Sequence, residues 1–227
     1  MTSSPRRRVP AVLLFTVLPL ALCCIGLLPA GQARAAAGAE PPVVRQLITV
    51  TAPAYGATYA TLRVYLVSGP RRTEVFGPWT ARVGYRGVAR PGKKREGDGT
   101  TPSGSYGLSF FFGVQPNLGF HFPFRHAYTY DYWDDDPASP RYNEWVNARI
   151  RNPGARPEPM HQVPAYDYAA VIAYNTARVP GRGSAIFLHV GTGGATAGCV
   201  SLPRAELIRL LRWLRPAYSP VISITVG

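Results

Sequence analysis

Short apolar runs separated by turn-forming residues dominate the chain beyond residue 43. These runs are rich in β-branched and aromatic residues, which is typical of strands. The predicted strands are 47–50, 61–67, 74–77, 79–83, 169–174, 184–189 and 219–226. One amphipathic helix is expected between Pro203 and Pro216, where leucines recur at helical spacing: Leu207, Leu210, Leu211 and Leu214. The pattern predicts a mainly β domain, a sandwich or barrel-like fold with a few short helices.

Two segments lack a clean period. Residues 87–107 are rich in Gly, Lys, Asp, Thr and Pro, which predicts a long loop leading into a hairpin. Residues 121–156 are aromatic and polar, which indicates a loop-rich insertion with a short helical turn near 143–148. No metal site is predicted from Asp134, Asp135 and Asp136, because three adjacent acids cannot all point at one ion.

The N-terminus has the layout of a secretory signal peptide. Three arginines at 6–8 precede an apolar run at 11–28 and a small-residue stretch around 33–35. We predict a signal peptide over 1–35, a linker over 36–43 and a single catalytic domain over 44–227. The apolar run approaches the roughly 20 residues of a membrane span, so an uncleaved anchor is the alternative, and the only expected link to a membrane. Either way the domain is secreted or held in the cell envelope, outside the cytoplasm.

The net charge of the chain limits the classes of partner that it is expected to bind. Removing residues 1–35 subtracts four arginines and no acids, so the net charge falls from +13 to +9. A basic exported domain is attracted to polyanions such as anionic cell-wall polymers, whereas nucleic acid is a poor partner outside the cell. Basic residues are scattered along the chain, so a solvated surface is the alternative interpretation of this charge.

Cysteine usage points to chemistry. Cys23 and Cys24 lie in the predicted leader, so the mature domain keeps Cys199 alone. A lone thiol in an exported protein indicates either a function that needs a thiol or a buried cysteine packed as a small hydrophobe.

His189 is the expected base for that thiol. It ends an apolar predicted strand, and the glycine-rich segment GTGGATAG leads from it to Cys199. A thiol has a pKa of roughly 8.5, so a nucleophilic cysteine needs a base or cation beside it. The backbone N–H groups of Gly198 and Cys199 are the predicted oxyanion donors, because a glycine lets the backbone approach a substrate carbonyl.

The segment HVGTGGATAGCV resembles the signature of the L,D-transpeptidase (YkuD-like) catalytic domain. His189 matches the family's general base, Thr196 its Ser/Thr, Gly198 its glycine and Cys199 its nucleophile. The upstream GDGTTPSGSY is similar to the family's Thr-Pro-x-Gly-x-aromatic element, carried by Thr101, Pro102, Gly104 and Tyr106. The chain departs from the family at Ala197, where many members carry a second His, and at Ser201, where Asn or Arg is common.

The resemblance implies two-step acyl transfer on peptidoglycan stem peptides, giving 3-3 cross-links. Cys199 would form a thioester and His189 would move the protons, oriented by the backbone carbonyl of Val190 or Gly191. No cofactor or metal is implied, and we expect a monomer. Further candidate substrate contacts are Thr196, Asn175, Tyr174, Tyr132 and Trp133.

Several alternatives remain open. Water in place of the acceptor amine would make the protein an L,D-carboxypeptidase. A papain-like thiol hydrolase would place its cysteine before its histidine, the reverse of the order here. A zinc peptidase would need His121, His126 or His161 at a spacing that fits no usual site. A non-catalytic wall-binding module would have no need to keep both His189 and Cys199.

Overall fold

The computed structural model describes residues 44–227. The predicted signal peptide and linker therefore lie outside the described residues. Within 44–227, no helix is both long enough and apolar enough to span a membrane.

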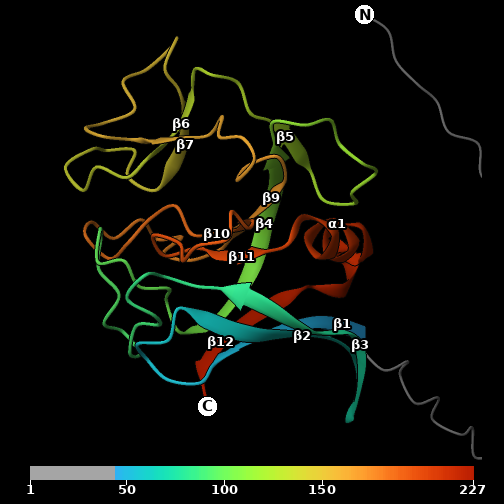
Figure 1. The fold of residues 1–227 in the computed structure, drawn as a ribbon. Coiled ribbons are helices and arrows are strands. Elements are labelled where there is room, and N and C mark those ends of the chain that lie inside the picture. The colour runs from blue at the N-terminus through green and yellow to red at the C-terminus, as the bar shows by residue number, and fades with distance from the viewer. Residues whose placement is uncertain (1–43) are drawn as a thin grey trace, which may run out of the picture. The chain divides into compact units, whose positions relative to one another are not determined.

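The described chain is mostly strand, as the apolar pattern predicted (Figure 1). A 3-10 helix, η1 (Pro216–Tyr218), precedes the last strand. The other elements, in chain order, are β1 (Val44–Ala52), β2 (Tyr59–Ser68), β3 (Arg71–Arg82), β4 (Gly104–Gly113), β5 (Phe124–His126), β6 (Asp131–Asp134), β7 (Glu144–Asn147), β8 (Glu158–Pro159), β9 (Ala169–Ile172), β10 (Phe187–Val190), β11 (Val200–Leu202), α1 (Arg204–Trp213) and β12 (Val221–Val226).

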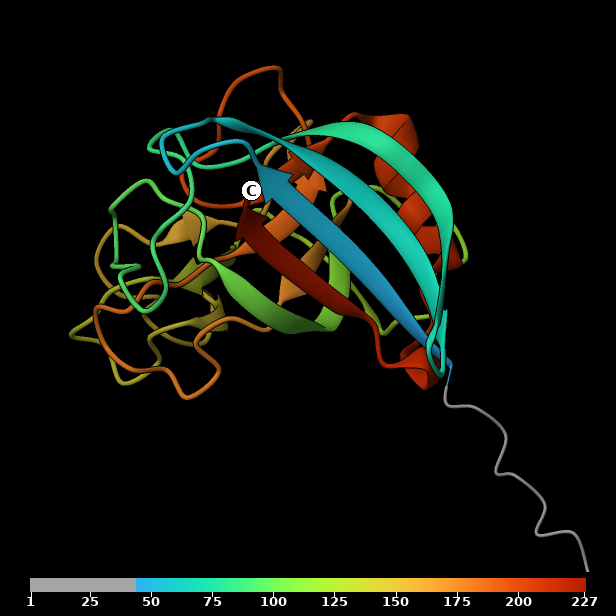
Figure 2. The same cartoon turned by 90° about the horizontal axis from the view of Figure 1, so that it is seen from below.

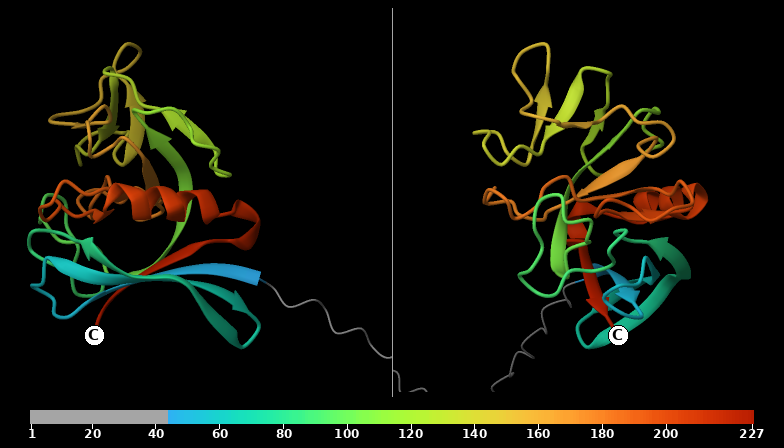
Figure 3. Two further views of the ribbon diagram at one scale, coloured as in Figure 1. Left: turned by 45° about the vertical axis from the view of Figure 1, so that its right-hand side comes forward. Right: turned by 60° about the vertical axis from the view of Figure 1, so that its left-hand side comes forward.

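The large sheet closes on itself. Its nine strands run in the order β12-β1-β2-β3-β11-β10-β9-β4-β5, and β4 pairs with β12 as well. The N-terminal half of β4 carries the pairing with β12, while its C-terminal half pairs with β9 and β5. Figure 2 shows β12, β1, β2 and β3 side by side as one curved layer, and Figure 3 shows β4 rising from that layer. The predicted barrel-like, mainly β class is confirmed.

The main core lies between this curved layer and the helix. Alternate residues of β1 and β2 point inward, so that Ile48, Val50, Leu62 and Val64 are fully buried. The four leucines predicted for the helix are buried against them. Burying one such leucine contributes roughly 1.5–3 kcal/mol. The helix thus fixes the chain that leaves β11.

A second core supports β10 from the other side. The small sheet, in the order β7-β6-β8, lies above it in Figure 1. Trp133 of β6 packs edge-on against Phe187 of β10, with ring centroids 5.1 Å apart. Phe112 of β4 contacts the same Phe187 at 5.2 Å. Aromatic contacts of this kind hold β10 rigidly between two cores.

Two local predictions were wrong. The helical turn expected near 143–148 is strand β7, which pairs with β6 along its whole length. The hairpin expected after the glycine-rich loop does not form either. The loop is present, but β4 at its end pairs with β5, β9 and β12, which all follow it in the sequence. Tertiary pairing decided both segments, and local composition does not encode it.

Candidate active site

Cys199 and His189 line the same pocket, of about 290 Å³. The pocket also takes residues from the glycine-rich segment after β10, from the loop at 94–97 and from the segment that follows β8. A cavity of this size suits part of a peptide, and its lining mixes apolar and charged side chains.

Parallel pairing of β10 and β11 brings the segments that carry His189 and Cys199 side by side. His189 lies opposite Ser201, and Leu188 lies opposite Val200. Cys199 directly precedes β11, so the glycine-rich connector and the strand pairing bring it next to the strand that carries His189. Both residues line the pocket.

The imidazole of His189 is held as a neutral base. Its Nδ1 lies 2.8 Å from the carbonyl oxygen of Val190, which can only accept, so Nδ1 carries the proton. The Nε2 lone pair is left for proton transfer. The ring is buried and contacts Tyr166 edge-on at 5.5 Å. Burial lowers the pKa of His189, and the carbonyls of Val190 and Ala165 offset only part of that effect. Of the two predicted orienting carbonyls, Val190 supplies the one bonded to His189 Nδ1, and Gly191 does not.

The thiol of Cys199 is sheltered in the resting protein. Cys199 is 7% exposed, its sulfur accepts the N–H of Phe187 and donates to the carbonyl of Ala185, both at 3.3 Å. Burial raises the pKa of Cys199 to about 12, and the charge of Glu158 acts in the same direction. The N–H of Phe187 and the ammonium of Lys94 oppose that shift. The resting pair is thus a neutral thiol and a neutral imidazole.

Thr196 organises the turn before the cysteine. Its hydroxyl donates to the carbonyl oxygen of Cys199 at 2.7 Å and accepts the N–H of Gly198 at 3.1 Å. The Gly198 N–H is therefore engaged and not free for an oxyanion, contrary to the prediction. Within residues 44–227, the Cys199 N–H donates to no acceptor. Gly198 serves the turn through its backbone: its φ is +152°, and a Cβ there would lie 3.0 Å from the carbonyl oxygen of Thr100.

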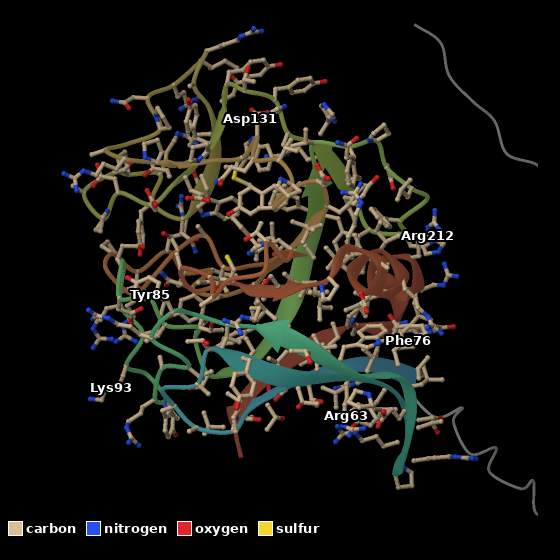
Figure 4. The ribbon with its side chains drawn as sticks, viewed as in Figure 1. Arg63, Phe76, Tyr85, Lys93, Asp131 and Arg212 are labelled. Carbon is tan, nitrogen blue, oxygen red and sulfur yellow. The ribbon has the colours of Figure 1, made fainter. Side chains whose placement is uncertain are left out.

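The upstream motif reaches the cysteine through Thr101. This fully buried residue donates from its hydroxyl to the carbonyl oxygen of Cys199 at 3.1 Å. Its loop is braced by Lys94 and Asp98, whose ammonium and carboxylate lie 2.6 Å apart. The N–H of Tyr85 donates to Thr196 at 2.7 Å, which ties the end of β3 to the same turn. Figure 4 shows Tyr85 and Lys93 on one side of the molecule, in the loop after β3.

Three carboxylates line the pocket: Glu96, Asp135 and Glu158. Glu96 accepts the hydroxyls of Tyr142 and Ser184, and Glu158 accepts the hydroxyl of Tyr166 at 2.6 Å. Burial raises the pKa of Asp135 to about 7, and the nearby charges of Glu96 and Glu158 add to the shift. Sequence reasoning missed these pocket residues, because they come from two loops and strand β8, with no shared motif.

Of the weaker candidate contacts, Thr196 lines the pocket and the other four lie outside it. Trp133 is buried in the second core, where its indole N–H donates to Asn143. Tyr132 lies on β6 without lining the pocket. Tyr174 and Asn175 line a neighbouring depression that shares Lys94 with the pocket. Aromatic residues in the insertion were thus used for packing, and its one pocket residue is the acid Asp135.

The residues considered for metals are dispersed. The Asp134 carboxylate is buried and accepts the hydroxyl of Ser139, while Asp136 accepts two backbone N–H groups. Only Asp135 of the three faces the pocket. Among the described residues, no three His, Cys, Asp or Glu side chains come together as a metal site.

Similarity to known proteins identifies the family of the chain. The chain matches the family model of the L,D-transpeptidase catalytic domain, YkuD, over residues 60–222. No curated protein sequence matches the chain. Among solved structures, it is similar to the helical cell shape determining protein Pgp2 (K307A mutant) from Campylobacter jejuni, with 16% identity and a TM-score of 0.39. That match covers 82% of this chain and 47% of the other, so the chain spans about half the length of that protein. The extent of the family match shows that the chain belongs to the YkuD family of L,D-transpeptidase catalytic domains.

Proposed function

We propose that the protein is an L,D-transpeptidase that cross-links peptidoglycan stem peptides through a thioester on Cys199. The observation that carries this proposal is the shared pocket of Cys199 and His189, with the imidazole tautomer set by Val190. A buried neutral thiol beside a neutral imidazole can be activated by direct proton transfer when a substrate carbonyl arrives.

The first step is acylation. The Cys199 sulfur attacks the carbonyl carbon between the diamino acid and the terminal D-alanine of a tetrapeptide stem. His189 Nε2 takes the thiol proton as the sulfur–carbon bond forms. The carbon–nitrogen bond then breaks, and the imidazolium gives its proton to the leaving amine. The Cys199 N–H is the free donor for the oxyanion of the tetrahedral intermediate.

The second step is transfer. An amine of a neighbouring stem attacks the thioester carbon and loses a proton to His189, and the sulfur leaves and recovers that proton. The product is a 3-3 cross-link. Water in place of the amine would release a tripeptide, the outcome expected of an L,D-carboxypeptidase. We propose that the protein acts outside the cytoplasm, where this substrate lies.

Intact-protein mass spectrometry after incubation with a tetrapeptide donor tests the proposal. We expect a mass increase equal to the donor minus D-alanine, located on Cys199 by peptide mapping. Adding an acceptor amine should convert the adduct into a cross-linked product. Absence of an adduct with the donor and with a carbapenem would refute the thiol mechanism, while release of tripeptide alone would assign carboxypeptidase activity.

A further inference from the structure

Negative charge gathers in the pocket of a basic protein. The chain carries 25 Lys and Arg residues against 12 Asp and Glu. Three of those 12 acids, Glu96, Asp135 and Glu158, line this one pocket. Among its lining residues in the described chain, Lys94 is the one Lys or Arg, and its ammonium already pairs with Asp98. The pocket therefore has an uncompensated negative charge beside the thiol.

Outside the pocket, some described acids pair with a Lys or Arg, while Asp131, Asp134 and Asp136 do not. Glu74, Glu144 and Asp167 each pair with an arginine. None of the three pocket acids lies within ion-pair distance of a Lys or Arg in residues 44–227. The partners of Glu96 and Glu158 are neutral hydroxyl and amide groups, which orient a carboxylate without cancelling its charge. No ion pair within residues 44–227 therefore cancels the charge of these carboxylates.

A separate feature of the pocket also points to a polar ligand. Ser201 is 1% exposed and lines the pocket, and its hydroxyl forms no hydrogen bond to any described residue. It lies opposite His189 in the parallel register. A buried hydroxyl without a partner costs free energy, so a hydroxyl kept in a pocket is available to a polar group that enters it.

From this arrangement we propose that Glu96, Asp135 and Glu158 form a subsite for a primary ammonium group of the substrate, seated beside the thiol. This inference rests on the proposed function and specifies its substrate. The ammonium could be the free side-chain amine of the diamino acid in the donor stem, or the amine of the acceptor stem before it loses a proton. Both present the same chemistry, a cation close to the reacting carbonyl.

The subsite also gives the bound cation a role in activation. The charge of Glu158 is one of the causes that raise the pKa of Cys199. An ammonium bound between the carboxylates and the sulfur would offset that charge and favour proton transfer to His189. The thiol would then be activated when a cationic stem occupies the pocket and stay protonated otherwise.

Paired donors provide the test. The rate of Cys199 acylation is measured by mass spectrometry with a tetrapeptide whose diamino acid carries a free amine and with its N-acetylated form. The proteins are the native chain, Asp135→Asn, Glu158→Gln and the control Glu206→Gln, which removes one charge from α1 outside the pocket. Asp135→Asn is the variant least prone to misfold, since no side chain hydrogen-bonds its carboxylate. A penem without a basic side chain serves as the amine-independent acylating probe.

For a donor subsite, the native protein should acylate about tenfold faster with the free amine than with the acetylated donor. That ratio should fall several-fold in Asp135→Asn and stay unchanged in Glu206→Gln, in which acylation by the penem should also match the native protein. For an acceptor subsite, the donor ratio is near one, but Asp135→Asn shifts the thioester from cross-linking towards hydrolysis. If neither step depends on the amine or on Asp135, the subsite is refuted. Failure of every probe to acylate Cys199 would instead refute the proposed function.

Discussion

The hydroxyl of Thr101 donates a hydrogen bond to the carbonyl oxygen of Cys199, 98 positions later in the chain. The same hydroxyl accepts the backbone N–H of Gly84 at 2.9 Å. One buried side chain therefore joins the end of β3, the glycine-rich loop and the cysteine. This contact explains why the two sequence motifs belong together: one motif positions the backbone of the other.

Thr101→Val tests this positioning role. Valine keeps the shape of the side chain but leaves the buried N–H of Gly84 without an acceptor, a loss of about 1–3 kcal/mol in unfolding free energy. The cysteine turn should also shift, and acylation by a carbapenem should slow by about tenfold or more. Denaturant unfolding and stopped-flow acylation measure the two effects. Thr225→Val, on the exposed part of β12, is the control. Unchanged acylation in a measurably destabilised Thr101→Val would show that the contact is only structural.

The catalytic pair gives the simplest prediction. Cys199→Ala should form no adduct with any donor. His189→Ala should retain the thiol but acylate at least about a hundredfold more slowly, the lower end for loss of a general base. Near-native turnover in either variant would contradict the assignment. Circular dichroism of both proteins checks that the fold is intact.

The pH dependence of acylation follows from the two shifted groups. Because burial lowers the pKa of His189 below its ordinary 6.5, its neutral form persists to lower pH, so the acid limb should lie below 6.5. Because the pKa of Cys199 is raised to about 12, iodoacetamide should alkylate the resting protein slowly at neutral pH. In His189→Ala the acid limb should disappear. An acid limb well above 6.5, or rapid alkylation at pH 7, would indicate a preformed thiolate–imidazolium pair instead.

Local sequence pattern was enough to predict β1, β2, β3, β9, β10, β12 and the helix, and to single out Cys199 and His189 as a candidate pair, but not β4, β5, β6, β8 or β11. β-branched runs, a leucine repeat and a strand-end histidine are all encoded within a few residues. The pairing of β4 with β12 was not predictable in this way, because it joins segments more than 100 residues apart. The short strand β7 was misread although its partner β6 lies nearby in the sequence, because its identity depends on that pairing and not on its own composition.

The other residues that line the pocket could not be predicted from the local sequence pattern. Glu96, Asp135 and Glu158 come from separate segments of the chain, and only the fold brings their charges together. The sequence contained one usable hint, the polar insertion at 121–156, but its aromatic residues drew the prediction to Tyr132 and Trp133. In the structure, Trp133 is used in the core behind β10. A motif can be found from the fixed spacing of its residues in the sequence, whereas the group of three carboxylates exists only in the folded protein.

Gly198 should tolerate no side chain. An alanine there would adopt a strained backbone, and its Cβ would lie 3.0 Å from the carbonyl oxygen of Thr100. We expect Gly198→Ala to lower the unfolding free energy by about 1–3 kcal/mol and to slow acylation by at least about tenfold. Gly56→Ala is the control, because a Cβ there meets nothing within 4 Å and the backbone is not left-handed. Equal melting temperatures and acylation rates for the two variants would contradict the role given to this glycine.

The negative charge on Asp135 should lower the free energy of unfolding, and the pH dependence of the melting temperature should show this effect. Its pKa is about 7 in the folded protein against an ordinary 3.8, so the folded state binds more protons between these values. Stability from this group is therefore present at low pH and lost as pH rises through about 7. Asp135→Asn should match the native melting temperature at pH 4 and exceed it at pH 8.

The neighbouring Asp136 should affect stability in the opposite direction. Hydrogen bonds from the N–H groups of Ala138 and Ala155 lower its pKa, so Asp136→Asn should melt at a lower temperature than the native protein at pH 8. A stabilised Asp135→Asn that has also lost its preference for amine-bearing donors would show that the carboxylate is kept for binding at a cost in stability.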